Sequence, residues 1–188
     1  MPQEPIEFAR EFRQNIAHTL LAAEHCLEQR QQMPALILMY SLMDSLAWAS
    51  FGPSATAGVG ERFESWATQW LLPYLGASYP EISARDLYAA RCAVLHTMTG
   101  DSDLSRKGKA KRVMYAWGTA DVEVLRRLIR GRLEATHVPL HYDGLLSSLM
   151  WAAAVFLEEA SRDPSLSQRV LAASARHYVN VEVKDGGI

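Results

Sequence analysis

The chain has 188 residues, of which 49% are apolar and 21% charged, a composition that supplies a core and excludes an intrinsically disordered protein. Nineteen Lys and Arg against 21 Asp and Glu give a net charge of −2, which excludes a uniformly basic nucleic-acid-binding protein. The length suits one domain with an appendage, and we place a single helical domain at residues 1–178 and a tail at residues 179–188.

Helical periodicity runs through most of the sequence. Apolar residues recur at three- and four-residue steps, and Pro, Gly and Ser residues indicate where helices begin and end. The predicted helices span residues 5–31, 35–50, 61–75, 83–100, 119–134, 145–161 and 165–176. Ser83 followed by Asp86 resembles a capping box at the start of the fourth helix, and Thr119 is the expected cap of the fifth. We expect loops at residues 51–60, 101–108 and 137–144, where Gly, Pro and polar residues gather. Residues 179–183 alternate between Val and polar residues, which predicts a short strand or an ordered extension.

Two of these helices carry the clearest packing signals. The first has one apolar face, whose predicted inward residues are Phe12, Ile16, Leu20, Ala23 and Leu27. The second, residues 35–50, is apolar nearly all round, which is typical of the central helix of a bundle. Because short connections favour antiparallel neighbours, the sequence predicts an all-α fold, a bundle of six to seven mostly antiparallel helices.

The cysteines and the apolar stretches favour an intracellular protein. Cys26 and Cys92 cannot form a disulfide framework and fit a reducing compartment. The N-terminus lacks an apolar signal core, and Asp44 interrupts the most apolar stretch of the chain. We therefore expect a cytoplasmic protein that does not span a membrane.

Asp44 is the unusual residue of the apolar second helix. An ionised carboxylate in an apolar setting must find a cation, find hydrogen-bond donors or take up a proton. The fold is therefore expected to bring an Arg or a polar cluster to Asp44. Two interpretations remain open: a buried anchor that fixes helix packing, or a residue that orients a catalytic Arg or His.

Residues 85–100 contain a second candidate site. Arg91 and His96 lie five positions apart, which puts them about 140° apart around a helix axis. The Arg side chain is long enough to bend toward the imidazole. His96 shares its own face with Tyr88 and Cys92, at steps of four residues.

Several segments together resemble the HEPN superfamily (higher eukaryotes and prokaryotes nucleotide-binding), all-α domains with an R-x4-6-H motif. The matching segments are ALILMYSLMDSLAW at residues 35–48, RFESW at residues 62–66 and DLYAARCAVLH at residues 86–96. A basic stretch and Tyr115-Ala-Trp-Gly118 then look like those of uncharacterised bacterial members. The resemblance covers roughly residues 35–118 and rests on order and spacing. The family motif usually has Asn, Asp or His after the Arg, whereas Cys92 follows Arg91 here.

The resemblance implies metal-independent RNA cleavage without a cofactor, often by a homodimer whose two motifs meet in one cleft. In this chain, His96 would take the proton of a ribose 2′-hydroxyl, and Arg91 would hold the scissile phosphate bidentately. Tyr88 would donate a further hydrogen bond, and Asp44 would orient Arg91. The products would be a 2′,3′-cyclic phosphate and a 5′-hydroxyl, and the protein would be a toxin or a defence effector.

A non-catalytic HEPN-like module that binds nucleotide, RNA or a protein is the alternative. In that interpretation Arg91 pairs with Asp44 inside the bundle, and His96 is a core histidine. The distinction depends on whether Arg91 and His96 reach solvent together.

The third feature is a concentration of positive charge. Nine basic and two acidic residues lie between Leu104 and Leu133, which gives this segment +7 and leaves −9 for the remainder. Such a segment favours contact with phosphates, although a charge run is often only solvated surface. An acidic antitoxin-like protein is another partner for it. The candidate RNA-binding residues are Arg106, Lys107, Lys109, Lys111, Arg112, Arg126 and Arg130.

Overall fold

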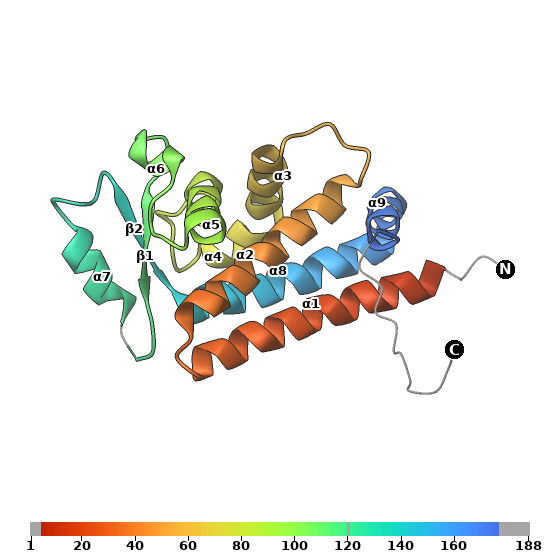
Figure 1. Ribbon diagram of the computed structural model, residues 1–188, viewed down its shortest axis with the longest axis horizontal. Helices are drawn as coiled ribbons and strands as arrows, with labels where there is room; N and C mark the ends of the chain where they lie inside the picture. Colours follow the sequence, from red (N-terminus) through yellow and green to blue (C-terminus); the bar gives the residue numbers. More distant parts are fainter. Residues whose placement is uncertain (1–4, 120, 177–188) are drawn as a thin grey trace, which may run out of the picture.

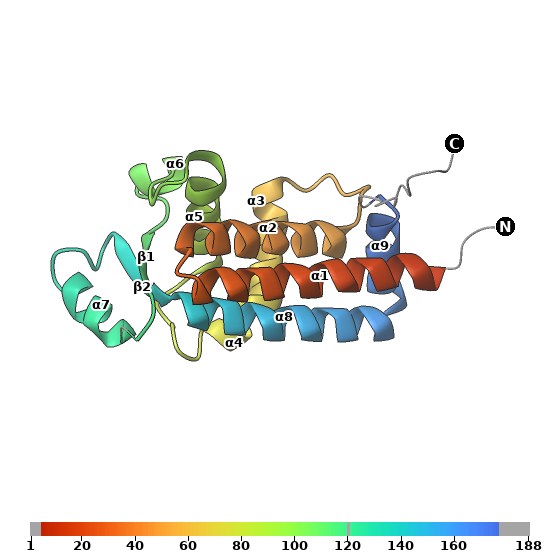
Figure 2. The ribbon, with the colours of Figure 1, turned by 60° about the horizontal axis from the view of Figure 1, so that its bottom comes forward.

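The computed structural model describes residues 5–119 and 121–176, with side chains from residue 10 onward. Most of these residues are helical, as predicted, and two short strands form a small sheet at one end. Three long helices lie side by side: α1 (Pro5–Glu28), α2 (Gln32–Phe51) and α8 (Tyr142–Arg162) (Figures 1 and 2). The prediction of an all-α bundle is therefore confirmed, with the sheet as an addition. The tail predicted at residues 179–188 lies outside the described residues.

The predicted inward face of α1 is confirmed. Phe12, Ile16, Leu20 and Ala23 are buried, and Leu27 packs against the same core. A short turn joins α1 to α2, and Arg30 has a positive φ of 57° in it. The two helices run antiparallel, as the short connection predicts (Figure 1).

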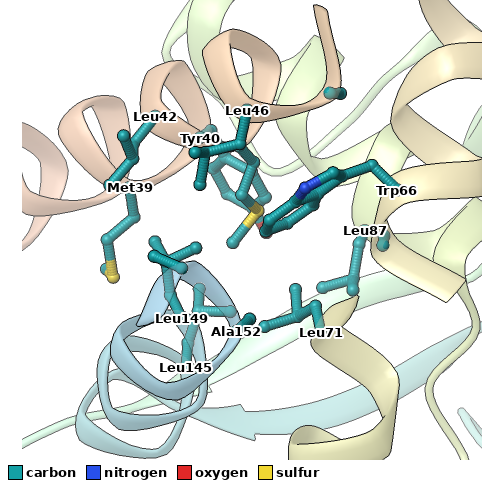
Figure 3. Packing of buried hydrophobic residues seen from close by; sticks show 14 of the residues in the cluster. Met39, Tyr40, Leu42, Leu46, Trp66, Leu71, Leu87, Leu145, Leu149 and Ala152 are labelled. Carbon is teal, nitrogen blue, oxygen red and sulfur yellow. The ribbon is translucent and has the colours of Figure 1, made fainter. Parts of the chain in front are cut away.

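Helix α2 is the centre of the bundle. It contacts α1, α3 (Val59–Trp66), α5 (Ala84–Thr97), α8 and α9 (Pro164–Ser174), so its apolar surface is covered on several sides. Met39, Tyr40 and Leu46 are among the side chains it buries, with Trp66, Leu87 and Leu149 packed opposite (Figure 3). Of the described helices, α2 alone is long and apolar enough to span a membrane, by length and composition only, and half of its apolar window is buried inside the bundle.

The predicted helix at residues 61–75 is interrupted by a wider turn. It consists of α3, a π-helical segment η1 (Ala67–Leu71) and α4 (Leu72–Leu75). Pro73 has no N–H to donate to the carbonyl four residues earlier, and a π-helical turn is one way to accommodate the ring. Trp66 and Trp70 still reach the same partner, because both make edge-on ring contacts with Phe156.

A parallel strand–helix–strand unit forms the small sheet, where the sequence predicted a loop at residues 137–144. Strand β1 (Arg112–Ala116) pairs with β2 (His137–His141), with Val113 opposite Val138, and α7 (Val122–Ile129) is the crossover. Pro139 lies within β2, which is tolerated because both strands of a two-stranded sheet are edge strands. Each strand has only five residues, too few for a clear alternation of apolar and polar side chains.

Helices α5 and α7 have other boundaries than predicted, and one short helix was not predicted. Helix α7 is capped by Asp121 rather than Thr119, and it ends at Ile129 because Arg130 leaves the helical conformation, with a ψ of 129°, and Gly131 has a φ of 91°. A short helix, α6 (Asp103–Arg106), lies within the predicted loop at residues 101–108, where Ser102 and Ser105 form a capping box. Helix α5 ends at Thr97, before the predicted Gly100, because Met98 takes the left-handed conformation.

Asp86 connects α5 to the sheet. The predicted capping box is present: Asp86 Oδ2 accepts from the Ser83 N–H at 3.0 Å, and Ser83 Oγ accepts from the Asp86 N–H at 3.2 Å. The second oxygen, Oδ1, accepts from the backbone N–H of Lys111 at 2.6 Å, just before β1. One buried carboxylate therefore fixes both the start of α5 and the entry to the sheet.

A buried tyrosine pair also joins the sheet to α2. The hydroxyls of Tyr40 and Tyr115 lie 2.5 Å apart, and the ring of Tyr142 packs 5.0 Å from that of Tyr115. Burial raises the pKa of both Tyr40 and Tyr115 above the ordinary value of a tyrosine.

The protein should lose stability as the pH rises above about 10, the pKa of tyrosine in an unfolded chain. In the folded state Tyr40 and Tyr115 hold their protons to a higher pH, so their contribution is complete below that value and is lost above it. Absorbance at 295 nm should show at least two of the seven tyrosines ionising only as circular dichroism reports unfolding. In the Tyr115→Phe variant, one tyrosine fewer should ionise only on unfolding. Ionisation of all seven in a protein with native dichroism would contradict the burial of the pair.

Candidate functional site

The candidate site lies where α5 crosses the middle of α2. The capping box at Ser83 fixes the start of α5, and the helix carries Tyr88, Arg91, Cys92 and His96 along its last three turns. Asp44 comes from the central turns of α2. The apolar residues of α5, Leu87 and Val94 among them, are buried and determine which side chains remain near solvent.

Arg91 is the cation that Asp44 was predicted to require. Its Nε donates to Asp44 Oδ2 at 2.7 Å, and its Nη2 donates to the same oxygen. The two side chains are only 13% and 22% exposed, so water screens this ion pair less than a surface pair. The other Asp44 oxygen, Oδ1, is buried and accepts no hydrogen bond from the described residues.

Burial and pairing act in opposite directions on these two groups. Burial raises the pKa of Asp44, while the hydrogen bonds and charge of Arg91 oppose that rise. Burial also acts to lower the pKa of Arg91, but the hydrogen bonds and charge of Asp44 outweigh it and raise the pKa. The guanidinium therefore stays charged, and its charge and its two hydrogen bonds favour the ionised form of Asp44.

The structure brings Arg91 and His96 together despite their angular separation. Arg91 bends along α5 so that its Nη1 lies 3.1 Å from His96 Nε2. A guanidinium only donates hydrogen bonds, so Nε2 accepts here, and the contact requires a neutral imidazole protonated on Nδ1. His96 is exposed, so the prediction of a core histidine in the non-catalytic interpretation is wrong.

Tyr88 lies beside the guanidinium and packs against α3. The Arg91 guanidinium carbon is 6.0 Å from the centre of the Tyr88 ring, and that ring lies 5.5 Å from the ring of Phe63. Burial and then the neighbouring Cys92 raise the pKa of the Tyr88 hydroxyl, which therefore remains a hydrogen-bond donor at neutral pH. The arrangement groups Asp44, Tyr88, Arg91 and His96 as the sequence predicted.

Two further residues of the site, Gly60 and Arg62, had no role predicted from the sequence, whereas Cys92 was noted there as the residue that follows Arg91. A Cβ atom at Gly60 would lie 2.9 Å from the Tyr88 ring, so a glycine there allows the ring to approach α3. The charge of Arg62 also acts on Asp44. The Cys92 sulfur lies 4.0 Å from Arg91 Nη1. In the sequence, Gly60 and Arg62 are marked only by their position just ahead of Phe63. That position cannot be interpreted without the contact between α3 and α5.

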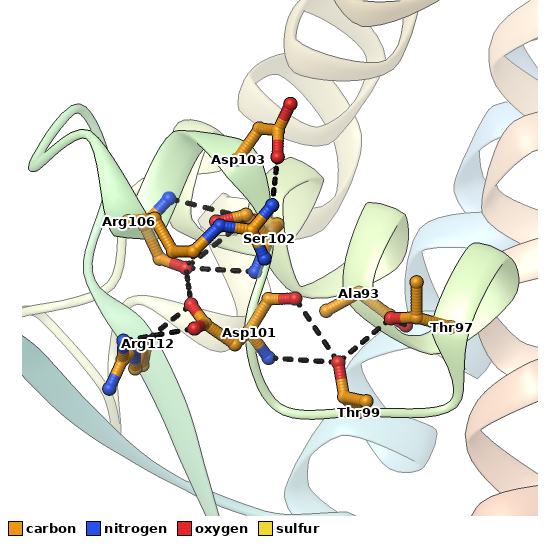
Figure 4. Close-up of polar contacts among 9 residues, drawn as sticks. Ala93, Thr97, Thr99, Asp101, Ser102, Asp103, Arg106 and Arg112 are labelled. Carbon is orange, nitrogen blue, oxygen red and sulfur yellow. Dashed lines mark hydrogen bonds and ion pairs between the residues drawn. The ribbon is translucent and has the colours of Figure 1, made fainter.

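Three of the seven candidate RNA-binding residues are already paired with carboxylates of the chain. Arg106 pairs with Asp103, and Arg112 lies 3.1 Å from Asp101, whose other oxygen accepts from Ser105 Oγ at 2.7 Å (Figure 4). The Ser105 hydroxyl, and next the charges of Arg112 and Arg106, lower the pKa of Asp101.

Arg126 is likewise paired, with Glu81 at 2.9 Å and with Glu123. It therefore does not share an exposed stripe with Arg130, because it turns inward and α7 ends before residue 130. Lys107, Lys109 and Arg130 are exposed, and Lys111 is half-buried.

A basic groove and the Arg91–His96 cluster are separate features. The groove has a volume of about 830 Å³ and lies between the start of α5, the segment around α6 and the beginnings of β1 and β2. Arg106, Lys109, Lys111 and Arg112 line it, and so do the carboxylates of Glu81 and Asp86. The lining includes none of Asp44, Tyr88, Arg91 and His96.

The fold and the site define a helical bundle with a partly buried Asp–Arg pair that reaches solvent through an exposed histidine. Within the part of the chain that the structure describes, no three His, Cys, Asp or Glu side chains gather in a way that could hold a metal ion. No protein-family model, curated protein or solved structure matches the chain.

The Asp44–Arg91 pair should contribute measurably to stability. In a double-mutant cycle with Asp44→Asn and Arg91→Met, we expect a coupling energy of about 1–3 kcal/mol, because each single variant leaves a partly buried partner unsatisfied. Urea unfolding followed by circular dichroism measures the four free energies.

The exposed pair of Asp103 and Arg106 is the matched control for this cycle. Asp103→Asn with Arg106→Met should give a coupling energy of about 0–1 kcal/mol, as is usual for surface pairs. Equal coupling in the two cycles would contradict a structural role for the Asp44–Arg91 pair.

Proposed function

We propose that the protein is a HEPN-type, metal-independent endoribonuclease whose active site contains Arg91 and His96. The observation that supports this most directly is the 3.1 Å contact between Arg91 Nη1 and the exposed His96 Nε2. A cation for phosphate and a neutral imidazole for proton transfer are then adjacent at the surface, within one chain.

Asp44 determines which part of Arg91 remains for a substrate. It accepts from Nε and Nη2, so it occupies one edge of the guanidinium. The opposite edge, formed by Nη1 and the second hydrogen of Nη2, retains two donors that match two oxygens of a phosphate. A phosphate on this edge takes the Nη1 hydrogen bond from His96, which releases the lone pair of Nε2.

The released imidazole then acts as the general base. It takes the proton of the ribose 2′-hydroxyl while the 2′-oxygen attacks phosphorus, and the bond to the 5′-oxygen breaks. Arg91 stabilises the charge on the phosphorane, and Tyr88 donates a hydrogen bond to it. The 5′-oxygen leaves with a proton from the imidazolium, which gives a 2′,3′-cyclic phosphate and a 5′-hydroxyl. DNA lacks the nucleophile and is spared.

The role that fits such an enzyme is that of a toxin or defence effector acting on RNA in the cytoplasm, held inactive by an antitoxin-like protein. The exposed Lys107, Lys109 and Arg130 would supply sequence-independent contacts to the RNA backbone. A homodimer is part of what the resemblance implies.

The second candidate function is a non-catalytic module that binds RNA or nucleotide. It is favoured by the separation between the basic groove and the Arg91–His96 cluster, since neither Arg91 nor His96 lines that groove. In this case Arg91 anchors Asp44, and ligand binding takes place at the sheet.

The purified protein should cleave a mixture of RNAs in the presence of EDTA and leave 2′,3′-cyclic phosphate ends. His96→Ala should lower the rate by at least roughly 10²-fold, because it removes the general base. His18→Ala, which changes an exposed histidine on α1, is the control and should cleave at the wild-type rate. Equal rates for His96→Ala and wild type, or cleavage that EDTA abolishes, would reject the mechanism. RNA binding without cleavage would favour the non-catalytic module.

RNA binding should weaken steeply with salt, because contacts to phosphates release counterions. Replacing the exposed residues Lys107, Lys109 and Arg130 by Gln should reduce the slope of log K against log salt by up to about 2, at about 0.7 for each contact with a single strand. The control replaces Arg106, Arg112 and Arg126, which are paired with carboxylates, and makes the same change in net charge. A larger effect in the control, or a flat salt response, would contradict these contacts.

A further inference from the structure

A second groove, larger than the basic groove, lies away from the Arg91–His96 cluster. It has a volume of about 1000 Å³ and is bounded by the C-terminal end of α1, the segment after β1 and the N-terminal end of α8. Its apolar lining consists of Leu27, Trp117, Tyr142, Leu146 and Met150. Trp117 is 49% exposed, which is unusual for a tryptophan in a folded chain.

The polar lining of this groove is mainly acidic. Glu24, Glu28 and Asp143 line it, and Arg30 is the one Lys or Arg among the described lining residues. Glu24, Glu28 and Asp143 are themselves exposed. The groove thus combines an apolar surface with a net negative charge, which fits an occupant that is apolar and positively charged.

Helix α7 has the complementary properties. Val124 and Leu128, four residues apart on one face, are 43% and 63% exposed. Arg127, Arg130 and Arg132, on the same helix and in the turn after it, are exposed as well. An exposed apolar pair surrounded by arginines fits a partly apolar, acidic surface.

The position of α7 is fixed by contacts on its other side. Ile129 is buried, and Arg126 is held by Glu81 and by the backbone oxygen of Ser78. The acidic residues at its start are engaged as well, Asp121 as the N-cap and Glu123 in an ion pair with Arg126. Helix α7 lies beyond the sheet, on the side away from the long helices (Figures 1 and 2). Val124 and Leu128 are thus presented by an ordered helix with its basic residues outward.

We propose that the protein forms a homodimer in which α7 of each copy docks in the acidic, apolar groove of the other. The groove and α7 are adjacent in one chain, because Trp117, Gly118 and Thr119 line the groove and α7 begins at Val122. A two-fold axis close to both can therefore place each helix in the partner's groove and close the assembly. Val124 and Leu128 contact the apolar lining, and Arg127 and Arg130 face Glu24 and Glu28.

This interface differs from the dimer that the HEPN resemblance implies, in which two R-x4-6-H motifs meet in one cleft. It includes none of Asp44, Tyr88, Arg91 and His96 and does not depend on ribonuclease activity. Arg130 is the one residue that the two proposals share, since a docked α7 withdraws it from RNA. Dimerisation is measured without RNA, so the inference can fail or succeed independently of RNA cleavage.

Charge reversal on the two surfaces tests the pairing. One variant carries Arg127→Glu with Arg130→Glu, and the other carries Glu24→Arg with Glu28→Arg. Sedimentation velocity of the full chain should show a wild-type dimer and a dimer dissociation constant raised roughly tenfold or more in either variant alone, because like charges then face each other. In an equimolar mixture of the two variants, both contacts of the mixed dimer are attractive again, so the dimer should return.

The return of the dimer in the mixture also shows that both variants are folded, because a misfolded chain would not dimerise with either variant. The control carries Glu11→Arg with Arg13→Glu, an exposed pair in the N-terminal half of α1, and should dimerise as the wild type does. A wild type that stays monomeric up to roughly 100 µM, which excludes tighter self-association, would overturn the proposal. So would variants that dimerise unchanged, or a mixture that does not recover.

Discussion

The packing of α5 against α2 depends on one constraint: the carboxylate of Asp44 requires a cation beside it. Helix α2 is covered by α1, α3, α5, α8 and α9, so a charged side chain in its middle loses much of its water. Asp44 is such a side chain, and Arg91 donates two hydrogen bonds to one of its carboxylate oxygens. Both groups are only partly exposed, so water weakens their contact less than it weakens a surface ion pair. The contact therefore holds α5 in place where it crosses α2.

The same contact organises the chemistry of the site. With one edge of its guanidinium on Asp44, Arg91 points its other edge toward His96 and solvent, and the Tyr88 ring lies beside it. The close approach of Tyr88 to α3 requires the absence of a side chain at Gly60. Three helices, α2, α3 and α5, are therefore needed to present one cation and one imidazole together.

The strand–helix–strand unit at the end of the bundle is a second distinct part of the fold. Asp86 attaches it to the start of α5, and the Tyr40–Tyr115 pair attaches it to α2. Arg112 and Arg126 of the unit, and Arg106 in the preceding helix α6, are paired with carboxylates, so the field of the basic segment is weaker than its charge of +7 suggests. Its remaining exposed charges and its exposed apolar side chains lie on α7 and in the turns beside it.

The sequence by itself determined the helices, the buried face of α1, the central position of α2, the capping box of α5 and the requirement of Asp44 for a cation. These follow from periodicity, from local backbone chemistry and from the cost of an unpaired charge, all of which act within one element. Only the tertiary structure decided that Arg91 is that cation, that it bends to His96, and that Gly60 makes room for Tyr88. It also decided that residues 112–116 and 137–141 pair as strands and that Arg126 turns inward. Those outcomes depend on contacts between residues distant in the chain, and a five-residue strand or a long flexible side chain leaves no local pattern that specifies its partner.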